Sequence, residues 1–251
     1  MRTILITGAS GGVGAAAARL FARRGYKVIL MARSADKLQA LAEEIGDDAV
    51  PVPCDAADAK AVARAAQQIK ADHGTPNILL NCAGAGAWKT VQDTTPQEAQ
   101  DMMGAPYFAA FNIARAFLPD MLDRRSGIIL SLNSPACVVP WRASVGYAAA
   151  RWALRGFHEA LAQDLVGTGV SACHVIFGRI TSEYFDTNDI DMASFPTFDR
   201  LIPPLSPEDC AETLLYLVRQ PRHEAIRPRR LAVILTFGRI FPGVARWSLR
   251  F

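Results

Sequence analysis

The sequence contains few features that mark secreted, metal-binding or membrane-spanning proteins. Its five cysteines are scattered and form no CxxC pair, which argues against a disulfide framework and a zinc site and favours a reducing compartment. No run of about 20 apolar residues is present, so no segment is expected to cross a bilayer. Gly8 interrupts the first apolar run, and no secretory signal is predicted. We therefore expect a cytoplasmic protein without a bound metal.

Charge is also sparse. Charged residues make up 20% of the 251, and the net charge of +3 gives no reason to expect nucleic acid as a partner. The positive charge is concentrated between residues 221 and 251, where seven arginines accompany a single glutamate. Hydrophobic residues reach 51%, which excludes a disordered chain, and the length suits one cooperative domain.

Apolar strand-like segments alternate with helical ones along most of the chain. The predicted strands are Thr3–Thr7, Lys27–Met31, Val50–Pro53, Asn77–Leu80, Gly127–Leu132 and Val170–Phe177. The predicted helices are Gly12–Arg24, Asp36–Ile45, Asp58–Ala71, Thr95–Met103, Tyr107–Asp123 and Ser144–Leu165. Near-continuous apolar strands separated by helices are typical of a parallel sheet covered on both faces. We predict a single doubly wound α/β domain over residues 1–228, with a long loop at 179–205, followed by a basic apolar tail at 229–251.

A glycine-rich turn, Thr7–Gly14, lies between the first strand and the first helix. Gly8 permits a tight turn, Gly12 lets the backbone approach a pyrophosphate, and Gly14 allows close packing of helix on strand. The start of the helix offers free N–H groups to the phosphates, and Ser10 and Val13 belong to the same turn. A glycine turn without a ligand is the alternative, but this position favours a Rossmann dinucleotide site.

The end of the second strand indicates which dinucleotide. NAD sites usually place a carboxylate there to hold the ribose hydroxyls, whereas this chain has Ala32 followed by Arg33. A guanidinium suits a 2′-phosphate by charge and geometry. A solvated surface arginine is the alternative. The sequence favours NADP(H).

Further motifs follow in order: Asn81–Gly84 after the fourth strand, and Ser134 thirteen residues before Tyr147 at the mouth of a long helix. Together with the glycine turn, they resemble the short-chain dehydrogenase/reductase family over essentially the whole chain. The resemblance implies further cofactor contacts at Asp55, Asn81, Ala83, Gly84, Gly178, Ile180 and Ser182.

The same resemblance implies hydride transfer between C4 of the nicotinamide and a carbonyl or alcohol. Tyr147 would be the acid or base, and Ser134 would hold the substrate oxygen. Tyrosine has a reference pKa of about 10, so a nearby cation is needed to favour the phenolate. Family members place a lysine four residues later, which lies on the same helix face. Tyr147 and this cation would also contact the cofactor.

This chain departs from the family pattern at two positions. Arg151 stands where the family has lysine; a guanidinium can hold the ribose and supply charge, but it cannot release a proton. Pro106, counted back from Pro119 without a gap, stands where the family has an asparagine that anchors a water of the proton relay. One interpretation is drift with catalysis kept. The other is altered or lost redox chemistry, which includes a silent NADP(H)-binding protein or a reductase of C=N or activated C=C bonds.

Aromatic residues on the predicted loops suggest an apolar substrate, although packing of a lid would explain them equally well. They are Trp88, Trp141, Tyr184, Phe185, Phe195 and Phe198. Cys137 is expected to line the substrate site as a neutral residue, and His158 and His174 are expected to be packing residues. By family analogy, a homodimer or homotetramer is expected.

The tail combines apolar and basic residues. Leu231–Phe241 is apolar around most of a helical circumference, and Val244, Trp247 and Phe251 share a face beyond Pro242. Such a segment suits peripheral contact with an anionic membrane, a gate over a lipid-like substrate, or a subunit interface. The sequence leaves these alternatives open.

Overall fold

The computed structural model describes residues 1–251 except 85, 183–198, 200–201 and 245–251. Its centre is a seven-stranded parallel sheet in the order β3-β2-β1-β4-β5-β6-β7. The strand order reverses between β1 and β4, where α/β sheets open a ligand crevice at their carboxyl edge. The strands are β1 (Thr3–Thr7), β2 (Lys27–Ala32), β3 (Ala49–Pro53), β4 (Ile78–Asn81), β5 (Gly127–Asn133), β6 (Val170–Phe177) and β7 (Glu224–Arg227).

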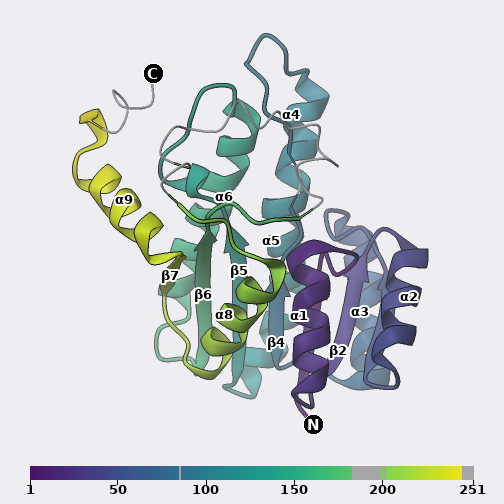
Figure 1. Ribbon diagram of the computed structural model, residues 1–251. Coiled ribbons are helices and arrows are strands. Elements are labelled where there is room, and N and C mark those ends of the chain that lie inside the picture. Colours follow the sequence, from purple (N-terminus) through teal and green to yellow (C-terminus); the bar gives the residue numbers. More distant parts are fainter. Residues whose placement is uncertain (85, 183–198, 200–201, 245–251) are drawn as a thin grey trace.

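Helices cover both faces of this sheet (Figure 1). α1, α2 and α8 pack on one face, and α3, α5 and α6 on the other. The helices are α1 (Gly12–Arg23), α2 (Ala35–Ile45), α3 (Ala59–His73), α4 (Pro96–Met103), α5 (Ala109–Asp123), α6 (Val145–Asp164), α8 (Pro207–Arg219) and α9 (Arg229–Ile240). The predicted doubly wound α/β fold is confirmed.

The alternation of side chains along each strand explains why the strands are apolar throughout. In β1, Ile4 and Ile6 belong to the core beneath α1, whereas Leu5 belongs to the core beneath α5, and all three are fully buried. A strand covered on both faces has no solvent side for polar residues. The two cores therefore fix the register of the central strands.

Two described elements, α8 and β7, were absent from the predicted set. α8 nevertheless begins with a clear signal: Ser206 accepts the N–H of Asp209, the Asp209 carboxylate accepts the N–H of Ser206, and Pro207 occupies the first helical position. β7 has only four residues, Glu224–Arg227, and its ends are charged. Its place at the sheet edge comes from pairing with β6, which local sequence does not encode.

The predicted helix Tyr107–Asp123 begins two residues later, at Ala109, because Gly104–Phe108 forms a π-helical turn between α4 and α5. Pro106 lies in the middle of this turn and is buried. A proline has no N–H to donate, and its ring collides with the carbonyl four residues earlier in an α-helix. The wider turn is the physical consequence of that conflict.

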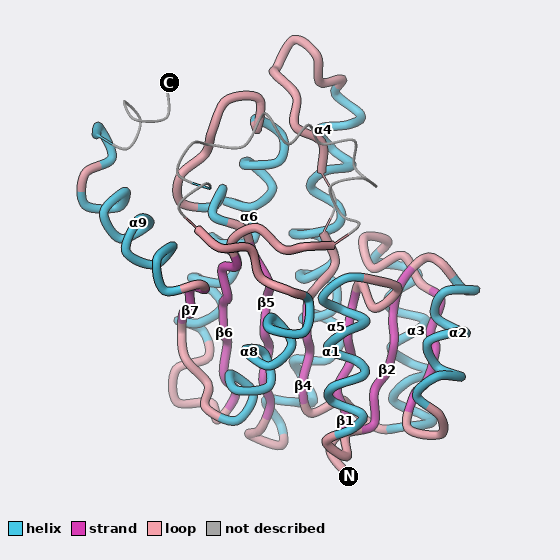
Figure 2. The backbone as a smooth tube through the Cα atoms, in the orientation of Figure 1, coloured by secondary structure: helices cyan, strands magenta, loops and turns pink. Residues whose placement is uncertain are grey.

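α9 leads away from the sheet toward the C-terminus (Figure 2). Its inner side is anchored: Leu231 and Leu235 are fully buried in a cluster with Ile176 of β6 and Ile226 of β7. Its outer side is exposed and apolar. Trp247 and Phe251 of the predicted tail lie outside the described residues. No helix within the described ranges is both long and apolar enough to cross a membrane.

Candidate active site

A cleft of about 1080 Å³ opens at the carboxyl ends of the strands, on both sides of the β1–β4 switch point. Almost all of the predicted site residues line it. These are Gly8, Ser10, Gly12, Val13, Gly14, Arg33, Asp55, Ala83, Gly84, Ser134, Tyr147, Arg151, Gly178, Ile180 and Ser182. Residues that follow six of the strands thus meet residues of α1 and α6 at one edge of the sheet.

The glycine turn forms one wall of the cleft. Gly8 has a φ of +67°, and a Cβ there would lie 2.9 Å from the backbone of Ala83, two residues after β4. A Cβ on Gly14 would lie 2.2 Å from the carbonyl oxygen of Gly8. α1 begins at Gly12, and its N-cap residue Gly11 supplies no side-chain cap. The first N–H groups of the helix therefore face the cleft uncapped, which suits a bound phosphate.

Two cations lie at the β2 end of the cleft. Arg33, directly after β2, is exposed, and so is Lys37 in the first turns of α2. Lys37 was not among the predicted residues, although its spacing of four from Arg33 at a helix start was a usable signal. Across the cleft, the carboxylate of Asp55 accepts the N–H of Ala57 at 2.9 Å, which fixes the loop after β3. At this end of the cleft, Arg33 and Lys37 can bind an anion, and Asp55 lies beside it to contact a polar group.

The three predicted catalytic residues converge on the other end. Ser134 follows β5, while Tyr147 and Arg151 stand one turn apart on α6. Tyr147 is 6% exposed and Arg151 only 4%. The Cζ of Arg151 lies 4.9 Å from the centre of the Tyr147 ring, a cation–π contact. A Cβ at Gly84 would approach the Arg151 guanidinium to 2.8 Å, so this glycine leaves room for the larger side chain.

An aromatic wall stands beside Tyr147. The Trp88 and Trp141 rings meet edge to face at 4.9 Å, and each lies about 6 Å from the Tyr147 ring. Met102 of α4 packs in the same cluster. Both tryptophans line the cleft, whereas Tyr184, Phe185, Phe195 and Phe198 lie outside the described residues.

Some predicted residues lie elsewhere. Asn81 is buried behind the cleft, where its side-chain amide donates to Ser131 Oγ at 3.3 Å, and it is not among the lining residues. Cys137 was expected to line the substrate site, and this expectation is wrong. Its side chain is fully buried in the cluster beneath α9, where burial raises the pKa of the thiol to about 12. Ser134 starts a short 3-10 turn, and that turn carries Cys137 away from the cleft.

Asn133 is a lining residue that the sequence analysis did not single out. It is 1% exposed, and its amide contacts Ser134, Arg151 and His174. Nothing in the local pattern distinguished it from the other residues at the end of a strand. Within the described residues, no group of His, Cys, Asp and Glu is arranged to hold a metal ion.

Comparisons with known proteins agree with this geometry. The short chain dehydrogenase family matches residues 2–192. A short chain dehydrogenase of Pseudocercospora fijiensis is 32% identical over 195 residues, 72% of this chain and 60% of that protein, so the chain spans less than two thirds of its length. A fatty acyl-CoA reductase of Acinetobacter baylyi is 30% identical over 239 residues, 93% of this chain and 78% of that protein.

Among solved structures, the closed form of serine dehydrogenase complexed with NADP+ superposes with a TM-score of 0.82 and 25% identity, covering 89% of this chain and 93% of that one. The parallel sheet, its switch-point cleft and the glycine turn define a Rossmann-type α/β fold with a dinucleotide-type cleft. The chain belongs to the short-chain dehydrogenase/reductase family.

Proposed function

We propose that this protein is an NADP(H)-dependent oxidoreductase that transfers a hydride between the nicotinamide and a carbonyl or alcohol of a hydrophobic substrate. The observation that carries the proposal is the convergence of Ser134, Tyr147 and Arg151 on the same cleft as the glycine turn. A bound nicotinamide would supply the hydride.

The residues present fit NADP(H). The uncapped start of α1 and the glycine cradle suit the pyrophosphate, and Arg33 with Lys37 suits a 2′-phosphate. Arg151 would hold the nicotinamide ribose beside Gly84, and Gly178, Ile180 and Ser182 would border the carboxamide. The NADP+ complex of the related serine dehydrogenase supports this assignment.

Tyr147 would donate a proton to the developing alkoxide, and Ser134 would hydrogen-bond the same oxygen. The Arg151 guanidinium over the Tyr147 ring would stabilise negative charge on the phenol oxygen. Arginine does not release its proton, so it acts here by charge and hydrogen bonding alone. Pro106 offers no side-chain hydrogen bond for a relay water, and only its backbone carbonyl could accept one there.

Trp88, Trp141 and Met102 give the substrate end of the cleft an apolar surface. The fatty acyl-CoA reductase of Acinetobacter baylyi, a relative over most of the chain, supports a substrate with an apolar body. An apolar wall with one tyrosine hydroxyl and one serine hydroxyl suits a molecule that carries a single reactive oxygen.

The experiment that tests the proposal is NADPH oxidation across a panel of ketones, aldehydes, quinones and imines, run beside Tyr147→Phe. Turnover of a ketone or aldehyde that disappears in Tyr147→Phe supports the proposal. Turnover of imines alone favours the C=N reductase. NADPH binding without turnover of any compound in the panel favours a catalytically silent NADP(H)-binding protein. Arg151 and Pro106, which depart from the family pattern, would then account for the lost activity.

We further propose that the protein is a homodimer or homotetramer joined through α5 and α6. Phe108, Phe111, Val145 and Trp152 are large apolar residues that are between 41% and 48% exposed next to or on these helices. Light scattering of the Phe111→Asp, Trp152→Glu double variant tests this. A lower mass supports the proposal, and an unchanged mass contradicts it.

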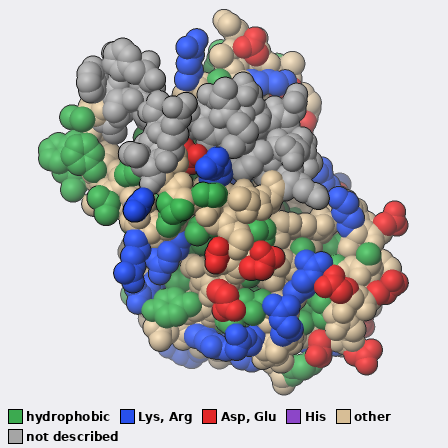
Figure 3. Space-filling model, in the orientation of Figure 1, with side chains coloured by type: hydrophobic (Ala, Val, Ile, Leu, Met, Phe, Trp, Pro, Cys, Tyr) green, Lys and Arg blue, Asp and Glu red, His purple; other side chains and the backbone are tan. Residues whose placement is uncertain are grey.

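A third proposal concerns α9, which we assign to peripheral contact of a cytoplasmic protein with an anionic membrane. Val233, Phe237 and Ile240 are 72%, 47% and 63% exposed on its outer side, and Arg229 and Arg230 stand at its start. Figure 3 shows a hydrophobic patch where Figure 1 places α9. Apolar residues beside arginines are what an interfacial helix needs. In this proposal, residues 1–228 form the catalytic domain and 229–251 the contact segment.

A further inference from the structure

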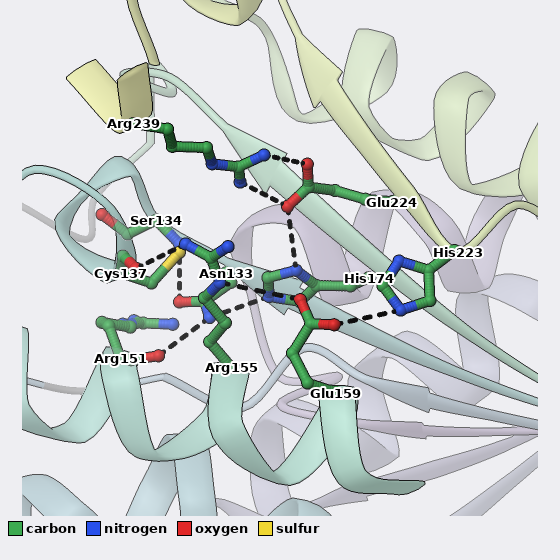
Figure 4. A network of polar contacts seen from close by, with 10 residues as sticks. All are labelled: Asn133, Ser134, Cys137, Arg151, Arg155, Glu159, His174, His223, Glu224 and Arg239. Atoms are coloured by element: carbon green, nitrogen blue, oxygen red, sulfur yellow. Dashed lines mark hydrogen bonds and ion pairs between the residues drawn. The ribbon is translucent and has the colours of Figure 1, made fainter. Parts of the chain in front are cut away.

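A line of polar side chains, fully buried at the cleft end and partly exposed at the other, leads from the cleft to α9 (Figure 4). It consists of Asn133 at the end of β5, His174 in β6, Glu224 in β7 and Arg239 on α9. Asn133 and His174 are 1% and 0% exposed. Polar groups this deeply buried are retained only with specific partners, so their arrangement constrains the elements that carry them. The hydride-transfer scheme above assigns no task to any of them.

Asn133 joins the two segments that carry the catalytic residues. Its Oδ1 accepts the N–H of Ser134 at 2.8 Å, and its Nδ2 donates to the carbonyl oxygen of Arg151 at 3.0 Å. Ser134 follows β5 and Arg151 lies on α6, eighteen residues from Asn133. One amide therefore sets the distance between the start of the Ser134 turn and the backbone of the helix that carries Tyr147.

The contact with His174 fixes the tautomer of that histidine. Because Oδ1 of Asn133 accepts from Ser134, the opposite atom of the amide must be the NH₂ group, which lies 2.9 Å from His174 Nε2. Nε2 must then be unprotonated, since a proton there would face another donor. The ring proton consequently lies on Nδ1, 3.8 Å from Glu224 Oε2.

Glu224 and Arg239 favour that proton position. Burial raises the pKa of the Glu224 carboxyl, but its contacts with His174 and Arg239 outweigh burial and hold the pKa well below its usual range. Arg239 donates to both carboxylate oxygens, at 2.8 and 2.6 Å. On the other side of His174, the His158 ring stacks at 4.9 Å, and burial lowers its pKa to about 3. His174 thus lies between a neutral ring and an anion that faces Nδ1.

We propose that Asn133 is a positioning residue for Ser134 and Arg151, and that Glu224 and Arg239 hold His174 in the tautomer that Asn133 requires. Loss of the Asn133 donor lets α6 shift against the Ser134 turn. A shift of a fraction of an ångström is enough to lower turnover, because Tyr147, Ser134 and the reacting carbon must meet in one geometry. The expected change in kcat rests on the proposed function, because it requires turnover. The expected change in NADPH affinity can be measured without turnover.

The first test compares Asn133→Asp with Asn77→Ala. Aspartate keeps an acceptor for the Ser134 N–H but places an oxygen against the Arg151 carbonyl. Asn77 also accepts a backbone N–H, that of Thr3 at 2.8 Å, but at the opposite end of the sheet. Asn133→Asp is expected to lower kcat at least about tenfold, to change KM less than about threefold, and to weaken NADPH binding about three- to tenfold. Asn77→Ala should lower Tm and leave kcat and the NADPH Kd unchanged.

The second test compares two replacements of His174. Glutamine can offer its Oε1 where Nε2 accepted from Asn133, whereas phenylalanine keeps a ring but has no acceptor. His174→Gln is expected to keep kcat within about threefold of the unmodified protein, and His174→Phe to lose at least about tenfold. A purely structural role would lower Tm in both and would not separate their kcat values.

The proposal is overturned if Asn133→Asp and His174→Phe behave like Asn77→Ala, with a lower Tm but an unchanged kcat and NADPH Kd. Failure of the proposed function looks different. If the proposed function is wrong, Tyr147→Phe leaves turnover unchanged. The role of Asn133 is then still decided by whether NADPH binds more weakly to Asn133→Asp than to Asn77→Ala.

Discussion

The guanidinium of Arg151 lies over the ring of Tyr147, with its Cζ 4.9 Å from the ring centre, and both side chains are buried at the edge of one cleft. Their spacing of four residues on α6 places them on one helix face. Arg151 therefore stands where it can serve both the phenol and a ribose in the cleft, and the variants below separate these two tasks.

Tyr147→Phe is expected to reduce turnover by about two to four orders of magnitude, because the acid is lost while the ring stays. NADPH binding should remain nearly intact, since the hydroxyl would make only one of many cofactor contacts. Steady-state kinetics and fluorescence titration measure the two effects. Unchanged turnover would exclude this tyrosine as the acid.

Arg151→Met is expected to damage both turnover and NADPH affinity, the latter by about tenfold or more, because charge and ribose hydrogen bonds disappear together. Arg151→Lys, alone or with Pro106→Asn, should retain or raise activity on simple carbonyls. If Arg151→Lys were as inactive as Arg151→Met, a cation at this position would not be what the reaction requires.

The cofactor preference should follow the residues after β2. NADPH is expected to bind at least about tenfold more tightly than NADH, which corresponds to about 1.4 kcal/mol. Arg33→Ala should remove most of this preference, Lys37→Ala part of it, and Ala32→Asp should reverse it. Arg23→Ala, at the far end of α1, is the matched control. Equal Kd values for both cofactors in the unmodified protein would contradict the assignment.

The stability of the fold should fall between pH 6.5 and pH 5 because of His158. Burial holds its pKa at about 3 in the folded protein, whereas the unfolded chain binds a proton near pH 6.5. Protons therefore favour unfolding across this window, by about 2 kcal/mol down to pH 5, before most carboxylates titrate. Denaturant unfolding at pH 7 and pH 5 measures the difference.

His158→Gln should flatten this pH dependence, and His73→Gln, on the surface end of α3, should leave it in place. The same slope in His158→Gln and the unmodified protein would show that the buried histidine is not the group responsible.

The outer face of α9 should bind anionic vesicles at low salt. Serine at Val233, Phe237 and Ile240 is expected to weaken binding at least about tenfold, through lost apolar burial. Val166→Ser, 76% exposed at the opposite end of the molecule, is the control. Binding should also fall in about 0.5 M salt. If the unmodified protein does not bind anionic vesicles, the membrane proposal is wrong, and a protein interface becomes the explanation for the exposed face of α9.

These substitutions test α9 more sharply than truncation after Pro228. Truncation would also remove Leu231 and Leu235, which are fully buried against β6 and β7. A truncated protein that unfolds would therefore report on the core and not on the membrane.

The sequence by itself determined the fold class and most of the cleft. The strands were recognisable because a two-sided sheet needs continuous apolar segments, and the glycine turn because only glycine fits at Gly8 and Gly14. Ser134, Tyr147 and Arg151 were identified because the order and spacing of the motifs resemble those of the short-chain dehydrogenase/reductase family.

Only the tertiary structure decided which residues meet across elements. Cys137 turned away from the cleft because the 3-10 turn after Ser134 directs it into the core beneath α9. The contact of Asn133 with Arg151, and the line through His174 to Glu224 and Arg239, join residues far apart in sequence. No local pattern encodes such a line, because burial and partner choice arise only when β5, β6, β7 and α9 pack together.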